Sequence, residues 1–234
     1  MKKLVVIIMI IFTLLGCSSK VEVKTDALKF KEDYESLNGK KIGYEDYYYR
    51  SLDIDSDNQF VYKSTKEILA MIDEEETFAV YFGFSSCSWC RSIISTLIEV
   101  ADDLDIDTIY YVDVREIRDT KEIDSNGNIV TTKEGTADYY KLLDKLEDVL
   151  DDYTITDKDG IEVSANEKRI YAPNIVAIVD GVPTKMTTGI SDLQENAYME
   201  LTDEIKEDSY NMMKSTIECI KEEKAICTND GKKC

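Results

Sequence analysis

The chain has 234 residues, a formal net charge of −20 and no histidine. This length is sufficient for one sizeable domain together with an anchor and a linker. A chain this acidic is not expected to bind nucleic acid, because it cannot neutralise phosphates. The absence of histidine excludes a His-based catalytic triad and a His-ligated metal site.

The N-terminus has the organisation of a bacterial lipoprotein signal. Lys2 and Lys3 precede an uncharged apolar run, Leu4–Leu15, which is shorter than the roughly 20 residues of a membrane-spanning helix. The run ends in Leu-Leu-Gly-Cys17, which resembles a lipobox, where the signal is cleaved before a lipidated cysteine. We expect residues 1–16 to be a cleaved signal peptide. Cys17 would then carry a lipid that contains palmitate. An uncleaved signal anchor and an ordinary secreted protein are the alternatives.

Such a lipid would hold the protein on the outer face of the cell membrane. Disulfides persist outside the cytoplasm, so the other cysteines would lie in an oxidising environment. Removal of Lys2 and Lys3 with the signal would change the charge from −20 to −22. An anionic membrane surface would repel this charge, so the lipid on Cys17 must supply the attachment.

Residues 17–58 are expected to form a tether and an N-terminal extension. Residues 20–41 are rich in charge and only weakly periodic. Three consecutive tyrosines, Tyr47–Tyr49, are unusual in a linker. We expect them to belong to a strand or an ordered coil that covers a sheet edge, with partner binding as the alternative.

A domain of α/β class is predicted over residues 59–230. Phe60–Tyr62 is typical of a short strand, and Ser64 or Thr65 can cap a helix with Ile68, Leu69 and Ile72 on its apolar face. Thr77–Phe84 and Thr108–Val114 are apolar runs typical of buried strands, and between them apolar residues recur at helical spacing from Ile93 to Leu104.

The middle of the domain, about residues 115–168, is expected to be an inserted hairpin–helix–hairpin segment. Asn126-Gly127 and Asp159-Gly160 indicate two hairpin turns. Between them, residues 136–150 predict an amphipathic helix whose apolar side consists of Tyr140, Leu143, Leu146 and Leu150.

The C-terminal part predicts a hairpin followed by a helix. Asn174–Val179 and Thr184–Thr188 are predicted strands joined by a turn at Asp180-Gly181. Residues 203–223 predict an acidic helix with four candidate buried positions, Met212, Met213, Ile217 and Ile220.

The motif that carries chemistry is Cys87-Ser88-Trp89-Cys90. It lies where a predicted strand passes into a predicted helix, so the first sulfur meets unpaired N–H groups and the positive end of the helix dipole. These favour a thiolate, the reactive form of cysteine. We expect Cys87 to be the attacking thiol and Cys90 to resolve the mixed disulfide, with Arg91 adding positive charge beside the pair.

Other uses of a CxxC motif fit less well. A haem attachment site needs histidine after the second cysteine, where this chain has Arg91. A zinc site needs a second ligand pair, and the spacing of Cys219 and Cys227 does not fit a zinc knuckle. A purely structural disulfide stays open. We therefore expect no metal and no cofactor.

The segment Tyr81–Arg91, Tyr-Phe-Gly-Phe-Ser-Ser-Cys-Ser-Trp-Cys-Arg, resembles the active-site segment of thioredoxin-like proteins. It is most similar to the Gram-positive group labelled bacteriocin transport accessory proteins. A second segment, Tyr171–Gly181, is similar to the family's cis-proline strand and hairpin. The resemblance covers about residues 60–114 and 169–224. It implies a thioredoxin-like fold, a central mixed sheet flanked by helices, with Pro173 as a cis-proline facing the CxxC motif.

The chain departs from thioredoxin at three places near this motif. Tyr81 stands where thioredoxin has a buried Asp six residues before the first Cys. Ser88 and Trp89 replace Gly-Pro between the cysteines, and the residue before the proline is Ala172, smaller than usual. These differences leave open whether the pair works as an oxidase, a reductase or an isomerase.

The remaining cysteines lie near the C-terminus. We expect Cys219 and Cys227 to form a structural disulfide between the last helix and the tail. The alternatives are a bond between Cys227 and Cys234, and a tail thiol that exchanges with the CxxC pair.

The function expected from these observations is that of a membrane-anchored, extracytoplasmic thiol–disulfide oxidoreductase. Its partners would be thiols or disulfides of exported proteins or peptides, and a membrane redox partner is compatible with this setting. The acidic surface predicts a cationic partner through electrostatic steering. The alternatives are a non-catalytic thioredoxin-fold module that binds an exported peptide and a metal-handling lipoprotein.

Overall fold

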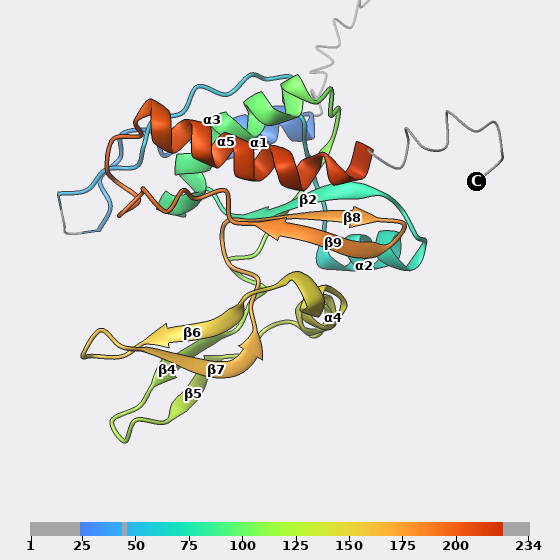
Figure 1. The fold of residues 1–234 in the computed structure, drawn as a ribbon. Coiled ribbons are helices and arrows are strands. Elements are labelled where there is room, and N and C mark those ends of the chain that lie inside the picture. Colours follow the sequence, from blue (N-terminus) through green and yellow to red (C-terminus); the bar gives the residue numbers. More distant parts are fainter. Residues whose placement is uncertain (1–23, 44–45, 222–234) are drawn as a thin grey trace, which may run out of the picture.

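The computed structural model describes residues 24–43 and 46–221. Its centre is a five-stranded sheet in the order β1-β3-β2-β8-β9 (Figure 1). Strands β1 and β2 run parallel to β3, whereas β8 runs antiparallel to both β2 and β9. The strands are β1 (Phe60–Tyr62), β2 (Phe78–Gly83), β3 (Ile109–Asp113), β8 (Asn174–Val179) and β9 (Val182–Thr187).

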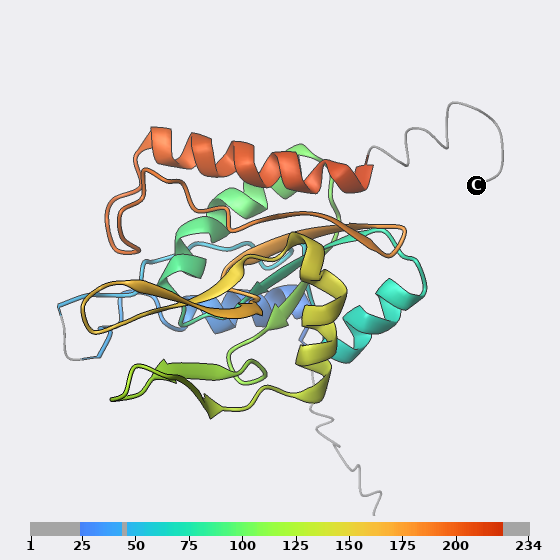
Figure 2. The same ribbon diagram turned by 60° about the horizontal axis from the view of Figure 1, so that its bottom comes forward.

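Helices cover both faces of the sheet. One face carries α1 (Asp26–Glu35), α3 (Ser88–Asp103) and α5 (Asp203–Ile217), and the other carries α2 (Thr65–Asp73) and α4 (Ala137–Leu146) (Figure 1). A single 3₁₀ turn, η1 (Glu147–Val149), follows α4. Figure 2 shows α2 and α4 side by side. The strand order and the two helix layers define a thioredoxin-like α/β fold, as the sequence predicted.

Strand β2 lies in the middle of the core. All six of its residues are buried, because the neighbouring strands β3 and β8 cover its two edges and helices cover both faces of the sheet. Successive side chains point to opposite faces, so Phe78, Val80 and Phe82 pack towards α2 and α4, while Ala79 and Tyr81 pack towards α1 and α3. The C-terminal end of β2 therefore delivers the CxxC loop from a rigid position.

The helix α2 begins with the cap expected from its sequence. The Ser64 side chain accepts a hydrogen bond from the Glu67 backbone, and the Glu67 carboxylate accepts one from the Ser64 backbone at 2.8 Å. These bonds satisfy donors that the first helical turn leaves unpaired. They also hold the pKa of Glu67 at about 2, and the backbone bond from Ser64 is the main cause.

Two hairpins are inserted between β3 and β8, on either side of α4. They are β4 (Thr120–Ile123) with β5 (Ile129–Lys133), and β6 (Asp152–Thr156) with β7 (Glu162–Lys168). This order confirms the predicted hairpin–helix–hairpin segment. The predicted helix face is partly wrong: Tyr139, Leu142 and Leu146 are buried, whereas Tyr140 and Leu143 are half-buried. Helix α4 belongs to the core through these residues.

Helix α1 was not predicted. It lies in the segment expected to be a tether and an N-terminal extension, and its Phe30 and Tyr34 side chains are fully buried. Phe30 stacks on Phe60 of β1 with ring centroids 3.9 Å apart, and on Tyr34 at 4.4 Å. Part of the extension is therefore part of the core.

The tyrosine segment is an ordered coil. Tyr48 forms an isolated antiparallel bridge with Lys41, and Tyr47 stacks on Tyr198, in the loop before α5, with ring centroids 4.2 Å apart. Tyr47 and Tyr48 remain exposed.

The C-terminal helix α5 agrees with its prediction at Met213 and Ile217, which are buried.

Ile220, just beyond the regular part of α5, is also buried, whereas Met212 is half-buried. Over the described residues, none of the helices is both long enough and apolar enough to span a membrane.

Candidate active site

Cys87 is the N-cap residue of α3. Its backbone is extended, so the chain turns from the loop after β2 directly into the helix. The Cys87 N–H donates to the Phe84 carbonyl at 3.0 Å, and the Cys87 sulfur accepts from the Cys90 N–H at 3.2 Å. The sulfur thus occupies the place of a capping oxygen and receives a donor that the helix start leaves free.

The second cysteine lies one turn further into the helix. Cys90 is fully buried, whereas 8% of Cys87 is exposed. Both thiols are free in this structure. Only Cys87 is therefore within reach of a substrate before the pair moves.

The loop before β8 completes the surroundings of Cys87. The peptide bond between Ala172 and Pro173 is cis. The Cys87 thiol donates to the Ala172 carbonyl at 3.2 Å, across 85 positions of sequence. The fold therefore brings together the two segments that carried the resemblance. Ser88 and Trp89, between the cysteines, are half-buried.

The environment separates the two thiols electrostatically. The hydrogen bond from the Cys90 thiol lowers the pKa of Cys87, with further contributions from the N–H groups of Cys90 and Trp89 and from the charge of Arg118; burial opposes them. Burial raises the pKa of Cys90 well above the usual thiol value, and hydrogen bonding to Cys87 adds to this. The thiolate consequently forms at Cys87.

Tyr81 lies beneath Cys90. Its hydroxyl hydrogen-bonds the Tyr34 hydroxyl at 3.0 Å, and all three residues are fully buried. Burial raises the pKa of the Cys90 thiol, and hydrogen bonding from Tyr81 opposes this rise. A side chain on Gly83 would meet the Tyr81 hydroxyl at 2.3 Å, so this ring position requires glycine there. The sequence singled out Tyr81 only as a departure from thioredoxin. It did not indicate Tyr34, whose helix was not predicted.

Arg91 does not act as expected. Its side chain is fully buried, and Nε donates to the Arg50 carbonyl at 2.9 Å. Nη1 donates to the Tyr34 carbonyl at 2.7 Å and to the Ser85 carbonyl at 3.3 Å. Nη2 donates to Asn38 Oδ1 at 2.6 Å. Arg91 therefore fastens the N-terminal extension to the start of α3. The expected positive charge beside the thiols comes from Arg118 instead.

Arg115 and Arg118 were not identified from the sequence. They lie in the turn after β3, and both guanidinium carbons lie near the Phe84 ring, 5.9 and 5.2 Å from its centroid. Arg115 Nη1 also donates to Ser86 Oγ at 3.3 Å. A short motif such as Asp-Val-Arg-Glu-Ile-Arg carries no signal of this placement, which follows from the parallel pairing of β2 with β3.

The remaining cysteines add no second site to the described structure. Cys219 is half-buried after α5, and its thiol donates to the Ser215 carbonyl at 3.6 Å. Cys17, Cys227 and Cys234 lie outside the described residues, so lipidation and the tail pairings stay predictions. Within residues 24–43 and 46–221, no three acidic or cysteine side chains are grouped to hold a metal ion.

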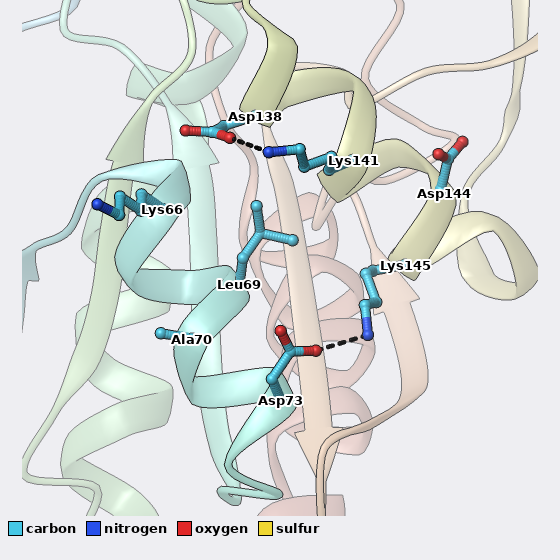
Figure 3. Close-up of a pocket in the computed structure, with 8 residues that line it drawn as sticks. All are labelled: Lys66, Leu69, Ala70, Asp73, Asp138, Lys141, Asp144 and Lys145. Carbon is cyan, nitrogen blue, oxygen red and sulfur yellow. Dashed lines mark hydrogen bonds and ion pairs between the residues drawn. The ribbon is translucent and has the colours of Figure 1, made fainter.

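A separate groove between α2 and α4 is lined by charged side chains (Figure 3). Lys145 pairs with Asp73 at 2.7 Å, and Lys141 with Asp138 at 2.8 Å, while Leu69 projects between the two helices. Because these charges compensate one another, the groove has no surplus charge for a ligand and none of the chemistry of the cysteine pair.

The fold and the site define a thioredoxin-like α/β domain with a Cys87–Cys90 pair at a helix start. No protein-family model matches the chain, and no curated protein matches it in sequence. The likeness to the bacteriocin transport accessory group therefore rests on the sequence segments alone.

Proposed function

We propose that this protein is a membrane-anchored, extracytoplasmic thiol–disulfide oxidoreductase acting on exported proteins or peptides. The observation that carries the proposal is the difference between the two thiols in exposure and in pKa. Cys87 keeps an exposed fraction of 8% and has a lowered pKa, while Cys90 is fully buried one helical turn away and has a raised pKa. A nucleophile and a resolving thiol need this difference.

The two thiols of the Cys87–Cys90 pair supply both electrons that reduce a substrate disulfide. The Cys87 thiolate attacks a substrate disulfide, so a bond forms between Cys87 Sγ and one substrate sulfur. The substrate S–S bond breaks, and its electron pair leaves with the second sulfur, which takes up a proton. Cys90 then loses its proton and attacks Cys87 Sγ, releasing the first substrate sulfur as a thiolate. The substrate gains two electrons and the Cys87–Cys90 pair loses them.

The reverse sequence oxidises a substrate dithiol through the same atoms. A reductase would need a donor at the membrane to reload the pair, and an oxidase would need an acceptor. The lipobox-like sequence ending at Cys17 supports membrane attachment. Replacing Cys17 with Ser should abolish incorporation of labelled palmitate, and unchanged incorporation would contradict the anchor.

A second candidate is a non-catalytic thioredoxin-fold module that binds an exported peptide. The small exposed fraction of Cys87, 8%, favours it, because a covered sulfur reacts slowly. In this case the cysteine pair would serve as a structural disulfide.

The reduction potential of the Cys87–Cys90 pair distinguishes the two candidates. The full chain would be equilibrated in dithiothreitol or glutathione redox buffers and followed by the fluorescence of Trp89, the only tryptophan. We expect a midpoint between about −120 and −280 mV, the range of working oxidoreductases. A midpoint below about −300 mV would indicate a structural disulfide and favour the binding module.

A further inference from the structure

The chain contains five arginines: Arg50, Arg91, Arg115, Arg118 and Arg169. Arg50 and Arg91 are joined through the Arg50 carbonyl, which accepts from Arg91 Nε at 2.9 Å. Arg115 and Arg118 flank Phe84, and Arg169 precedes Ala172 by three positions.

Two of these arginines have carboxylate partners. Arg115 lies 3.6 Å from Asp113 and 3.7 Å from Glu116. Arg169 pairs with Asp119, and its Nη2 also donates to the Asp119 carbonyl at 2.9 Å. These side chains of Asp119 and Arg169 are 4% and 7% exposed, so the pair is closed to other partners.

Arg118 is different because its own neighbour in sequence, Asp119, is already bound to Arg169. Over the described parts of the chain, the Arg118 guanidinium forms neither an ion pair nor a side-chain hydrogen bond. It is nevertheless half-buried against the Phe84 ring. A partly desolvated charge without a partner is costly, so its presence calls for an anion at this position.

The first such anion is the Cys87 thiolate. Phe84 connects the two groups, since its ring carries the Arg118 guanidinium and its carbonyl accepts from the Cys87 N–H at 3.0 Å. The charge of Arg118 favours the thiolate accordingly. Once Cys87 forms a mixed disulfide, its sulfur is neutral, and Arg118 loses that anion.

A carboxylate on the substrate fits the place that the thiolate has vacated. The guanidinium is planar and always charged, and its fork of donors matches a carboxylate in bidentate fashion. We propose that Arg118 binds a carboxylate of the polypeptide substrate, so that the site prefers cysteines with Asp or Glu beside them. This inference rests on the proposed oxidoreductase function and names the substrate class of the same site.

The preference acts at contact distance and differs from the long-range steering that the net charge predicts. Steering between exposed charges is screened beyond about 8–10 Å at physiological ionic strength. The test therefore compares substrates at high salt, where steering is suppressed and a partly buried contact persists.

The experiment uses three disulfide-linked peptide dimers that are identical except for Glu, Gln or Lys next to the cysteine. The reduced full-length protein is mixed with each peptide in about 0.5 M salt, and oxidation is followed by Trp89 fluorescence. Each rate constant is divided by the rate constant of the same peptide with dithiothreitol, which removes differences in intrinsic disulfide reactivity. We expect the Glu peptide to react about tenfold faster than the Gln peptide, with the Lys peptide slowest.

Arg118→Gln should reduce this preference to less than about twofold, because its side chain cannot provide a charged fork. Arg115→Gln is the matched control and should keep the preference, since Arg115 already has carboxylate partners. A ratio between two peptides on one variant is independent of the Cys87 thiolate fraction. It therefore separates substrate binding from an effect on the thiol.

Equal corrected rates for the Glu and Gln peptides on the wild-type protein would overturn the inference, whether or not Arg118→Gln folds. An unchanged preference in Arg118→Gln would also overturn it. Both outcomes would leave the proposed function intact, because exchange itself would have been observed. Absence of exchange with all three peptides would overturn the proposed function together with the inference.

Discussion

The hydroxyl oxygens of Tyr34 and Tyr81 lie 3.0 Å apart inside the core, and hydrogen bonding from Tyr81 opposes the rise in the pKa of Cys90 that burial causes. Burial raises the pKa of both tyrosines well above the usual value, so neither serves as a base. Tyr81 is therefore a hydrogen-bond donor to the Cys90 sulfur when the thiolate forms. A donor in a dry core stabilises a charge strongly, because no water competes for it.

Replacing Tyr81 with Phe removes this donor while keeping the ring. We expect Cys90 to attack the mixed disulfide about tenfold more slowly, since a hydrogen bond to a charged group contributes roughly 1.5 kcal/mol or more. Rapid acid quenching of the wild type and variant, followed by mass spectrometry, measures the lifetime of the mixed disulfide. Tyr34→Phe is the control and should have a smaller effect. Equal lifetimes in Tyr81→Phe and wild type would contradict the role.

The pH dependence of alkylation tests the separation of the two thiols. The pKa of Cys87 is lowered, so its thiolate persists to lower pH than that of an ordinary thiol. In the folded, reduced protein its alkylation rate should rise with a midpoint below about 8.5 and then level off. Cys90, with its raised pKa and full burial, should stay unmodified over the same range. Similar rates for both in the folded protein would show that the environment does not distinguish them.

Trapping of partners tests the order of attack. Cys90→Ser keeps the Cys87 nucleophile and removes the resolving thiol, so mixed disulfides with substrate should accumulate and disappear on reduction. Cys87→Ser is the matched control and should trap little, because Cys90 is fully buried. Gel shifts under non-reducing conditions measure both. Trapping by Cys87→Ser alone would reverse the assignment.

The sequence predicted the parts of the fold that have strong local patterns. The hydrophobic runs of β2, β3 and β8 indicate buried strands, and the CxxC motif follows β2 at the junction where the structure has it. Helix α1 escaped prediction because its apolar side is small: of its four apolar residues, Ala27, Leu28, Phe30 and Tyr34, only Phe30 and Tyr34 are buried. The other six residues of the helix are charged, and this composition favoured a tether over an amphipathic helix.

Tertiary contacts decided what the local patterns left ambiguous. In α4, Tyr139 and Tyr140 are adjacent, as are Leu142 and Leu143, so two stripes one position apart both have helical spacing. Packing against α2 and the sheet selected Tyr139 and Leu142.

The prediction that Arg91 adds positive charge beside the cysteines relied on its position in the sequence. A residue next to Cys90 in sequence lies about 100° around the helix, so adjacency does not bring its charge to the thiols.

The buried guanidinium of Arg91 predicts a large stability effect. Lys cannot reproduce its planar fork, so Arg91→Lys should leave the carbonyls of Tyr34 and Arg50 without donors. We expect a loss of about 3 kcal/mol in the free energy of unfolding, measured by urea denaturation. The N-terminal extension should also become more sensitive to proteolysis. Arg115→Lys, at an exposed site, should change stability by about 0.5 kcal/mol or less.

The buried pair of Asp119 and Arg169 predicts a non-additive effect at the base of the inserted hairpins. Asp119→Leu alone would leave the Arg169 charge desolvated without a carboxylate, at a cost of about 3–5 kcal/mol in the free energy of unfolding, and Arg169→Met alone would do the same to the Asp119 charge. Removing both charges, in Asp119→Leu with Arg169→Met, should recover much of this loss, because the penalty comes from the unpaired charge. Urea denaturation of the single and double variants measures the coupling. A double variant that loses the sum of the two single losses would show that the residues contribute independently and that the ion pair has no special role.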